Sequence, residues 1–304
     1  MFQQHLAPVA LFVFARPAHT RQTLDALLAN DLASKTDLIV YSDGARAGAD
    51  ETAVQEVRDL IRALRGFKSV TLIERPRNYG LASNIISGVT ETLNQFGQII
   101  VLEDDLVTSP HFLDFMNQGL AKYRDKEKVA SIHGYCYPVK DPIPELFFLR
   151  GADCWGWATW SRAWDCFESN GTKLLAELKQ RDLIKEFDRG ISYRVYSKML
   201  KKQIAGRNNS WAIRWHASTF LNGMYTLYSR ESLINNIGHD ASGVHCAQND
   251  HYGNHTHNSR IMLKDIAIVE NADAVFAFRR FYESIRPSLL MAILGKLKQM
   301  VGMQ

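Results

Sequence analysis

Short apolar runs alternate with segments of helical periodicity over the first hundred residues of the chain. Four runs are short and rich in β-branched residues or leucine, which predicts buried strands within 8–14, 38–41, 70–73 and 99–102. The segments between them place apolar residues three or four positions apart, which predicts helices, the last over about 81–96. This β-α-β-α-β-α-β order predicts an α/β fold with a mostly parallel sheet and right-handed crossovers.

The second half of the chain has a less regular pattern. A Ser-Pro pair at 109–110 predicts the start of a helix, and apolar runs near 129–132 and 227–228 predict two more strands. Charged helical periodicity over 172–205 predicts connecting helices. We therefore divide the chain into a first half, a second half that contains a glycine-punctuated loop at about 235–258, and an amphipathic tail, with bounds 1–126, 127–270 and 271–304.

Three consecutive carboxylates, Glu103, Asp104 and Asp105, follow the fourth predicted strand. In open α/β sheets, ligands bind at the carboxyl ends of the strands. Adjacent carboxylates repel one another unless a cation or hydrogen-bond donors compensate them, and Mg²⁺ or Mn²⁺ bound with a substrate phosphate would do so. The alternative is an acidic, solvated turn, and the triplet alone does not decide between the two.

Polar residues also follow the other predicted strands. Arg16 follows the first and could pair with a phosphate or stack on a base, or it is a surface arginine beside Pro17. Asp43 follows the second and could accept hydrogen bonds from a base or ribose, or it belongs to a plain Ser-Asp-Gly turn. No G-x-G-x-x-G follows the first strand, which argues against a dinucleotide-binding domain. Taken together, the strand ends predict a mixed-charge cleft suited to a nucleotide diphosphate and a metal.

Four motifs within residues 8–125 carry a family resemblance: Ala-Arg-Pro, Ser-Asp-Gly, Arg-Asn-Tyr-Gly-Leu-Ala-Ser-Asn and Glu-Asp-Asp-Leu, in that order. As a set they resemble nucleotide-sugar glycosyltransferases of the GT-A fold, and most closely the bacterial relatives of N-acetylglucosaminyltransferase I. The resemblance implies a Rossmann-like, mostly parallel sheet flanked by helices, with a C-terminal acceptor-side region.

The resemblance also implies roles for individual residues. Asp105 is the expected ligand of Mn²⁺ or Mg²⁺ on the donor diphosphate, with Asp104 facing the ribose or sugar and Glu103 supporting the pair. Further matched positions near the nucleoside, or on the loop and helix start that flank it, are Arg16, Asp43, Asn78, Gly80 and Asn84.

The catalytic base is the point at which the sequence departs from this family. The resembled enzymes carry an acid after the first tryptophan of the segment that corresponds to 209–216, where this chain has Ala212. An inverting enzyme needs a general base within hydrogen-bond reach of the acceptor hydroxyl. The candidates are Asp153, which matches an acid before the family's Gly/Trp-rich loop, His216 and Asp240.

Aromatic residues and loop histidines complete the predicted site. One or two of Trp155, Trp157 and Trp160 are expected to face a sugar ring, and the others to lie in the core. In the resembled family the loop at 235–258 folds over the donor diphosphate, which makes His239 and His245 candidate phosphate or metal contacts. The alternative is that these histidines ligate nothing, since their spacing matches no zinc signature.

Bulk composition limits the other possibilities. The 304 residues carry a net charge of only +4, so no nucleic-acid partner is predicted. The four cysteines have no C-x-x-C spacing, the first residues do not resemble a signal peptide, and no apolar run approaches the ~20 residues that span a bilayer. A cytoplasmic protein is expected. An amphipathic helix over 288–301 would allow peripheral contact with the inner membrane face, or would dock on its own domain or on a dimer partner.

We therefore expect a metal-dependent hexosyl- or N-acetylhexosaminyl-transferase that uses a UDP-sugar, with inversion. Its acceptor would be a carbohydrate or lipid-linked sugar of bacterial surface polysaccharide or glycolipid synthesis. One alternative is a sugar-nucleotide nucleotidyltransferase, although the usual glycine-rich phosphate loop near the first strand is absent. The other is a catalytically weak sugar-binding module of the same fold, which Ala212 leaves open.

Overall fold

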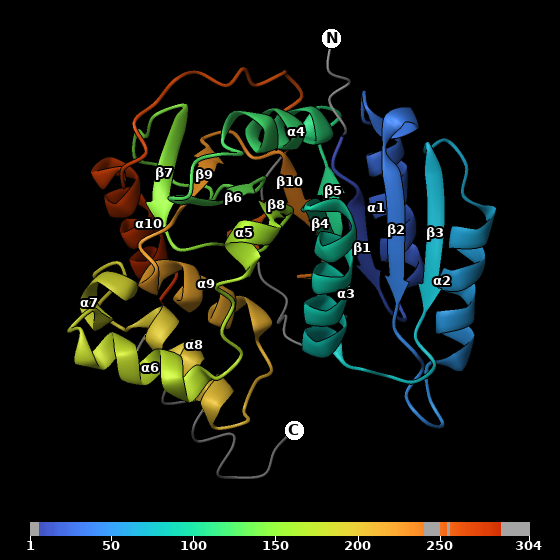
Figure 1. Cartoon of the computed structure of the whole chain (residues 1–304), viewed down its shortest axis with the longest axis horizontal. Coiled ribbons are helices and arrows are strands. Elements are labelled where there is room, and N and C mark those ends of the chain that lie inside the picture. The colour runs from blue at the N-terminus through green and yellow to red at the C-terminus, as the bar shows by residue number, and fades with distance from the viewer. Residues whose placement is uncertain (1–5, 240–249, 254–255, 287–304) are drawn as a thin grey trace.

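The computed structural model describes residues 6–239, 250–253 and 256–286. Within these residues, one sheet has eight strands in the order β3-β2-β1-β4-β8-β6-β9-β7 (Figure 1). Its strands are β1 Val9–Val13, β2 Asp37–Ser42, β3 Ser69–Glu74, β4 Gln98–Glu103, β6 Val129–His133, β7 Leu146–Arg150, β8 Trp157–Trp160 and β9 Tyr225–Ser229.

The sheet is mostly parallel, which confirms the predicted α/β fold. Strands β3, β2, β1 and β4 are parallel neighbours, and β6 is parallel to β9. Strand β8 is antiparallel to both β4 and β6, and β7 is antiparallel to β9. The register pairs Val13 with Ser42 and Ser42 with Glu74, so the carboxyl ends of the first three strands lie at one edge. The end of β4 joins them, because Phe12 pairs with Glu103.

Helices cover both faces of the sheet (Figure 1). Those of the first half are α1 Pro17–Leu28, α2 Glu51–Ala63, α3 Leu81–Phe96 and α4 Phe112–Lys122. Those of the second half are α5 Ser161–Trp164, α6 Gly171–Gln180, α7 Ile184–Phe187, α8 Val195–Ile204, α9 Trp211–Leu221 and α10 Ala272–Ser284. The periodic segment 172–205 thus forms α6 to α8, which Figure 1 shows grouped with α9 away from β1 to β3.

Strand β1 shows why the first strands are continuous apolar runs. Val9 and Leu11 pack on the face covered by α1, α2 and α4, whereas Ala10 and Phe12 pack on the face covered by α3, α5 and α9. Side chains alternate between faces along a strand, so a strand buried on both faces has no polar alternation. All four of these side chains are buried.

A second, two-stranded sheet was not predicted from the sequence. Strand β5, Leu106–Thr108, pairs antiparallel with β10, Ile234–Asn236, and Ile237 N–H donates to the carbonyl oxygen of Asp105 at 2.9 Å. This pairing brings the start of the predicted lid loop against the acidic triplet, although about 130 residues separate them in sequence.

The predicted halves share one sheet, because β4 of the first half pairs with β8 of the second. The predicted amphipathic helix at 288–301 lies outside the described residues. Among the helices that the structure does describe, none is both long enough and apolar enough to cross a membrane.

Gly88 on α3 gives a test of the packing between this helix and the sheet. An alanine Cβ there would lie 2.6 Å from the Phe12 ring and 3.1 Å from the Tyr41 ring. Glycine to alanine in a helix interior normally stabilises by about 1 kcal/mol, but overpacking a core costs about 1–3 kcal/mol. We expect Gly88→Ala to lower the free energy of unfolding in urea. Ser83→Ala, on the exposed side of α3, is the control and should change it by less than about 0.5 kcal/mol. A Gly88→Ala variant as stable as wild type would contradict this packing.

Candidate functional site

The acidic triplet is compensated by an arginine of the same chain. Arg16 lies between β1 and α1, where Pro17 occupies the first helical turn. Its guanidinium pairs with the Asp104 carboxylate, and its Nη2 also donates to Asp105 Oδ2 at 2.9 Å. The hydroxyl of Thr23 on α1 donates to the Asp104 carbonyl oxygen at 2.9 Å, which ties α1 to the triplet. Two carboxylates thus share one guanidinium.

Burial and the neighbouring charges raise the pKa of Glu103 and of Asp104. Burial, followed by the charges of Asp105 and Asp104, raises the pKa of Glu103 to about 8, so this residue is mainly protonated at neutral pH. Burial also raises the pKa of Asp104, against the attraction of Arg16. The pKa of Arg16 is raised, because its two carboxylate partners outweigh its own burial. Arg16 is thus the cation that pairs directly with Asp104 and Asp105.

The segment after β10 closes over Asp105. A Cβ at Gly238 would collide with Asp105 Oδ2, so a residue without a side chain is needed for this close approach. The His239 ring lies 5.4 Å from the Trp155 ring and 5.3 Å from the Tyr252 ring. Burial lowers the pKa of His239, although the negative charge of Asp105 acts to raise it. The Nε2 atom of His239 is buried and has no hydrogen-bond partner among the described residues. The structure thus brings His239 to the triplet, whereas His245 lies outside the described residues.

A hard cation fits this group only with help from a ligand. No cluster of three or more His, Cys, Asp or Glu side chains in the described part of the chain is arranged to hold a metal. The carboxylate of Asp105 supplies the oxygen ligand that Mg²⁺ and Mn²⁺ favour, and such ions commonly complete their shell with phosphate oxygens and water. The unpartnered His239 Nε2 is a further polar atom on the same side.

Asp43 and Asn78 form a separate network beside the triplet. Asp43 is only 4% exposed, and its Oδ1 accepts hydrogen bonds from the backbone N–H groups of Gly44 and Tyr79, at 2.9 and 2.7 Å. Its Oδ2 accepts from Gly80 N–H at 2.9 Å, and Asn78 Nδ2 donates to the Gly44 carbonyl oxygen at 2.8 Å. These bonds join the end of β2 to the start of α3.

Asn84 belongs to the interior of the same wall. It is 3% exposed, and its Oδ1 accepts from Arg75 Nε at 3.0 Å. The Arg75 guanidinium lies over the rings of Tyr41 and Tyr79, 5.0 and 5.1 Å from their centroids. The polar atoms predicted to contact a nucleoside are thus engaged by the chain itself at Asp43 and Asn84, where they shape the wall of the site.

Asp153 is the one partly exposed acid among the described base candidates. Tyr228 donates its hydroxyl to Asp153 Oδ2 at 2.7 Å, and no described residue donates to Oδ1. Burial raises the pKa of Asp153, but the charges of His133, Arg189 and His216 and the Tyr228 hydrogen bond together lower it below its usual value. Asp153 is therefore ionised at neutral pH, with one oxygen available.

The short loop before β8 places Asp153 near the triplet. Burial, and then the negative charges of Glu103, Asp153 and Asp105, raise the pKa of the intervening Cys154 thiol. Cys154 thus lies within electrostatic reach of both carboxylate groups.

His216 lies inside the protein. It is 3% exposed on α9, its ring stacks on Tyr196 at 4.6 Å, and its Nδ1 lies 2.9 Å from the Ala152 carbonyl oxygen. Gly151, with φ +87°, covers the ring, since a Cβ there would lie 2.5 Å from it. Burial and the charge of Arg189 lower the pKa of His216 to about 4. The third candidate, Asp240, lies outside the described residues.

The predicted tryptophans divide between the core and the site. Trp157 is completely buried and Trp160 is 4% exposed, so both are core residues. Trp155 is partly exposed and its ring lies 4.7 Å from that of Tyr135, beside His239. Of the three, Trp155 is the one whose ring can meet a ligand.

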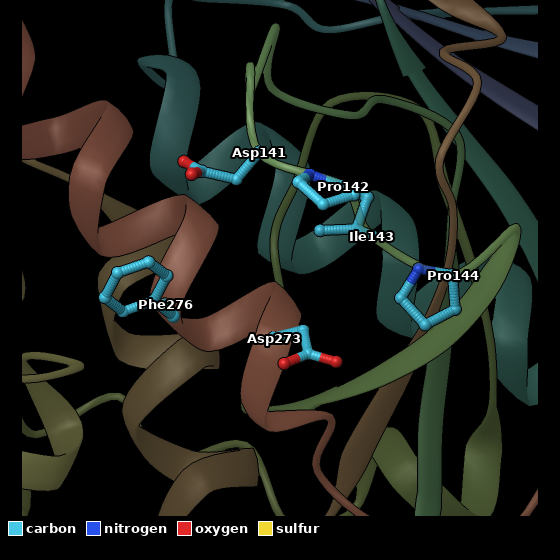
Figure 2. Close-up of a pocket in the computed structure, with 6 residues that line it drawn as sticks. All are labelled: Asp141, Pro142, Ile143, Pro144, Asp273 and Phe276. Atoms are coloured by element: carbon cyan, nitrogen blue, oxygen red, sulfur yellow. The ribbon is translucent and has the colours of Figure 1, made fainter.

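A surface cavity of about 440 Å³ lies elsewhere, between the 141–144 segment and α10 (Figure 2). Its walls include Ile143, two prolines and Phe276. Figure 2 shows two carboxylates at its border, Asp141 and Asp273, and Asp141 is already paired with Arg280 at 3.0 Å. None of its lining residues was predicted to belong to the site.

Sequence reasoning missed several residues that surround Asp153, above all Arg189, Tyr196 and Tyr228. Arg189 is 6% exposed and has a left-handed backbone, with φ 51°. Its only sequence signal is a charged turn, Asp188-Arg189-Gly190, between two helical segments. Nothing in that pattern shows that the arginine points inward.

Comparisons with known proteins leave the family open. No protein-family model matches the chain, and no curated protein sequence is significantly similar to it. Similar solved structures include the mannosyltransferase PcManGT from Pyrobaculum calidifontis with GDP-Man and Mn²⁺, at 16% identity and a TM-score of 0.29, over 41% of this chain and 34% of that one. Two structures of S. aureus TarS each match 75% of this chain at 11% identity. Their TM-scores are 0.38 for residues 1–349 and 0.34 for the other structure, with 59% and 36% of those chains covered.

This chain therefore matches between about a third and three fifths of the length of these solved structures. With such low TM-scores and identities, the similarity does not indicate an activity for this chain. The resemblance to N-acetylglucosaminyltransferase I relatives stays a prediction. A function is therefore inferred from the chemistry of the site residues.

Replacing Arg16 tests the charge balance of the triplet. Arg16→Met should lower the melting temperature, because two partly buried carboxylates lose their shared donor, at a cost of about 1–3 kcal/mol. Mn²⁺ without nucleotide should restore more of the lost stability in this variant than it adds to wild type. Arg62→Met removes an exposed arginine paired with Glu74 and serves as the control. Equal Mn²⁺ responses in all three proteins would contradict the assignment.

The buried histidines predict a pH dependence of stability. Burial lowers the pKa of both His133 and His216 to about 4, whereas an unfolded histidine titrates near ~6.5. Between pH 6.5 and 4 the unfolded chain binds protons that the folded chain does not, so the free energy of unfolding should fall as the pH falls. Urea titrations should show a smaller slope for His216→Asn, by up to about 1.4 kcal/mol per pH unit. His257→Asn, at a partly exposed position, is the control, and an unchanged slope in His216→Asn would contradict the prediction.

Proposed function

We propose that this protein is a metal-dependent glycosyltransferase that moves a hexosyl or N-acetylhexosaminyl group from a UDP-sugar to a hydroxyl acceptor. One observation carries the proposal: two carboxylate sites with different surroundings flank the loop at Cys154. On one side, Asp104 and Asp105 lie at the end of a parallel strand with a cationic partner. On the other side, Asp153 is ionised and keeps one oxygen available. Sugar transfer needs such a pair, a cation site for the leaving diphosphate and a base for the attacking hydroxyl.

On the donor side, Asp105 is the residue that would hold Mn²⁺ or Mg²⁺. The ion would neutralise the leaving diphosphate as a Lewis acid. Arg16 supplies N–H donors that suit phosphate oxygens as well as carboxylates, so it can bind the diphosphate when the carboxylates are otherwise compensated. His239 lies on the same side, with an unpartnered Nε2. The wall beside the nucleoside is held in place by the hydrogen bonds of Asp43, Asn78, Gly80 and Asn84.

On the acceptor side, Asp153 acts as the base. Tyr228 holds Oδ2, which leaves Oδ1 to accept the proton of the attacking hydroxyl. His216 acts as a positioning residue, because its Nδ1 contacts Ala152, the residue before Asp153. Trp155 offers an aromatic face for a sugar ring beside His239. Direct attack on the donor carbon would invert the anomeric configuration.

The biological setting of the proposal rests on sequence resemblance. It comprises a cytoplasmic enzyme, an acceptor in bacterial surface polysaccharide or glycolipid, and peripheral membrane contact through the 288–301 segment. His245 and Asp240 keep their proposed roles as phosphate contact and second base candidate. A sugar-binding module with weak catalysis is the second candidate function, favoured by Ala212 on α9 and by the Arg16 pair that already compensates the triplet.

Release of UDP from UDP-N-acetylglucosamine, UDP-glucose and UDP-galactose, with and without Mn²⁺, tests the donor side. We expect Mn²⁺-dependent release from one of them. Asp105→Ala should abolish it while keeping the far-UV spectrum, because the metal loses its protein ligand. The control Asp59→Ala removes an exposed acid of α2 and should act as wild type. Unchanged turnover in Asp105→Ala would refute the metal role, and absence of nucleotide binding by wild type would refute the proposed function.

Asp153→Asn tests the base separately. It should bind the UDP-sugar with wild-type affinity in isothermal titration and lose about 10²–10⁴-fold in kcat. The amide keeps the size of the side chain but cannot accept the proton. A variant that retains wild-type kcat would exclude Asp153 as the base.

A further inference from the structure

Six polar side chains from separate segments form one group around Asp153, which we call the Asp153 cluster. They come from β6, the loop before β8, the turn after α7, α8, α9 and β9, and are His133, Asp153, Arg189, Tyr196, His216 and Tyr228. The Arg189 guanidinium lies 5.7 Å from the centroid of the Tyr196 ring, and that ring stacks on His216 at 4.6 Å. The His133 ring lies 5.0 Å from the ring of Tyr228, and the Tyr228 hydroxyl donates a hydrogen bond to Asp153 Oδ2.

Polar atoms without partners are concentrated in this cluster. Among the described residues, Nε and Nη1 of Arg189 and Nε2 of His216 are buried and have no hydrogen-bond partner. The Tyr196 hydroxyl lies against Tyr282 and Arg189, and the His133 ring against the Tyr135 backbone. Each such group costs about 1–3 kcal/mol when it stays unpaired. Buried polar groups in folded proteins are nearly always satisfied by protein, water or ligand. Three such atoms in one cluster, two of them on Arg189, therefore point to guest oxygen atoms.

The charges of the cluster select the kind of guest. Arg189 is 94% buried, and its Nη2 donates a long hydrogen bond of 3.4 Å to the Arg150 carbonyl oxygen. In the described part of the chain, no carboxylate lies within the 4.0 Å of an ion pair from Arg189, Asp153 included. The two opposite charges nevertheless act on each other. The Arg189 nitrogens and the Asp153 oxygens are thus more than 4.0 Å apart.

A neutral hydroxyl is the group that satisfies both sides. Its oxygen accepts a hydrogen bond from an Arg189 N–H, and its hydrogen is donated to Asp153 Oδ1. A carboxylate or phosphate would accept from Arg189 but has no hydrogen for Asp153, and the two negative charges would repel. The unpartnered Nε2 of His216 adds a polar atom for a neighbouring hydroxyl, and adjacent hydroxyls are the pattern of a sugar.

We propose that Arg189 and Asp153 bind one neutral hydroxyl oxygen between them, so that Arg189 is a positioning and specificity residue for uncharged sugar acceptors. Water fills this position in the free protein, and a hydroxyl of the acceptor replaces it. The identity of the guest as an acceptor rests on the proposed glycosyltransferase function. The bridged oxygen itself does not, because it follows from the unpaired atoms and the charges.

A crystal structure of the full chain without donor, at a resolution that shows ordered water, tests the bridged oxygen directly. We expect one water within hydrogen-bond distance of both an Arg189 nitrogen and Asp153 Oδ1. A direct ion pair between the two side chains, or no ordered oxygen between them, would overturn the proposal. The result does not depend on catalysis, so it stands even if the proposed function fails.

Variants and acceptor probes test the role in specificity. With UDP-sugar and Mn²⁺, Arg189→Met should lower kcat for UDP release at least tenfold with little change in KM for the donor, and Arg189→Lys should recover part of it. A purely structural role would instead change stability and donor KM together. Arg280→Met, which removes an exposed arginine paired with Asp141, should act as wild type.

The acceptor probes are methyl β-glucoside and methyl β-N-acetylglucosaminide, compared with methyl β-glucuronide. The neutral glycosides should increase UDP release by wild type more than the glucuronide does, and Arg189→Met should lose this increase. A glucuronide that is the best acceptor, and that loses its advantage in Arg189→Met, would overturn the specificity for neutral hydroxyls. If no variant and no wild-type protein releases UDP, the proposed function fails, and the crystal structure still decides the bridged oxygen.

Discussion

The site depends on how negative charge at the end of β4 is compensated. A buried strand delivers Glu103, Asp104 and Asp105 to one point, where three ionised carboxylates could not coexist at low dielectric. Protonation of Glu103 removes one charge, and the guanidinium of Arg16 is shared by the other two. Because Arg16 belongs to the end of β1, this compensation also joins the first and fourth strands. A cation from outside would take over a role that the chain already performs.

Asp153 and Arg189 show the opposite arrangement. Asp153 also lies near a buried arginine, but Arg189 is held away from it among aromatic rings. The charges of His133 and then Arg189 lower the pKa of Asp153, although Arg189 forms no direct ion pair with it. Under the proposed function, the direct pair compensates Asp104 and Asp105 until a metal binds, and the separated pair leaves Asp153 able to accept a proton. The loop at Cys154 connects the two environments.

The scaffold makes this proximity possible through three ladders. Parallel pairing of β3, β2, β1 and β4 aligns their carboxyl ends. Antiparallel β8 starts beside the end of β4, so the loop that precedes it, with Asp153 and Trp155, returns to the same edge. The small β5–β10 pair then brings Gly238 and His239 over Asp105. Each contact follows from strand register, since the side chains meet only where the backbone ladders place them.

The sequence by itself determined the α/β order, the first four strands, the helix at 81–96 and the acids at the end of β4. These features are local, because the pattern of apolar and polar residues within each segment predicts a strand buried on both faces or a helix. It also named Asp153 and His239, which the structure brings to the site. Only the tertiary structure decided that Asp43 and Asn84 are engaged by the chain, and that His216 is buried.

Only the tertiary structure also showed that Arg16 pairs with the triplet and that Arg189 is buried where its charge acts on Asp153. These features join residues 88 positions apart in the first case and 36 in the second. A lone arginine has the same local pattern on a surface as in a core. Whether its charge meets water, a carboxylate or an aromatic ring is set by packing between distant elements, which no local pattern records.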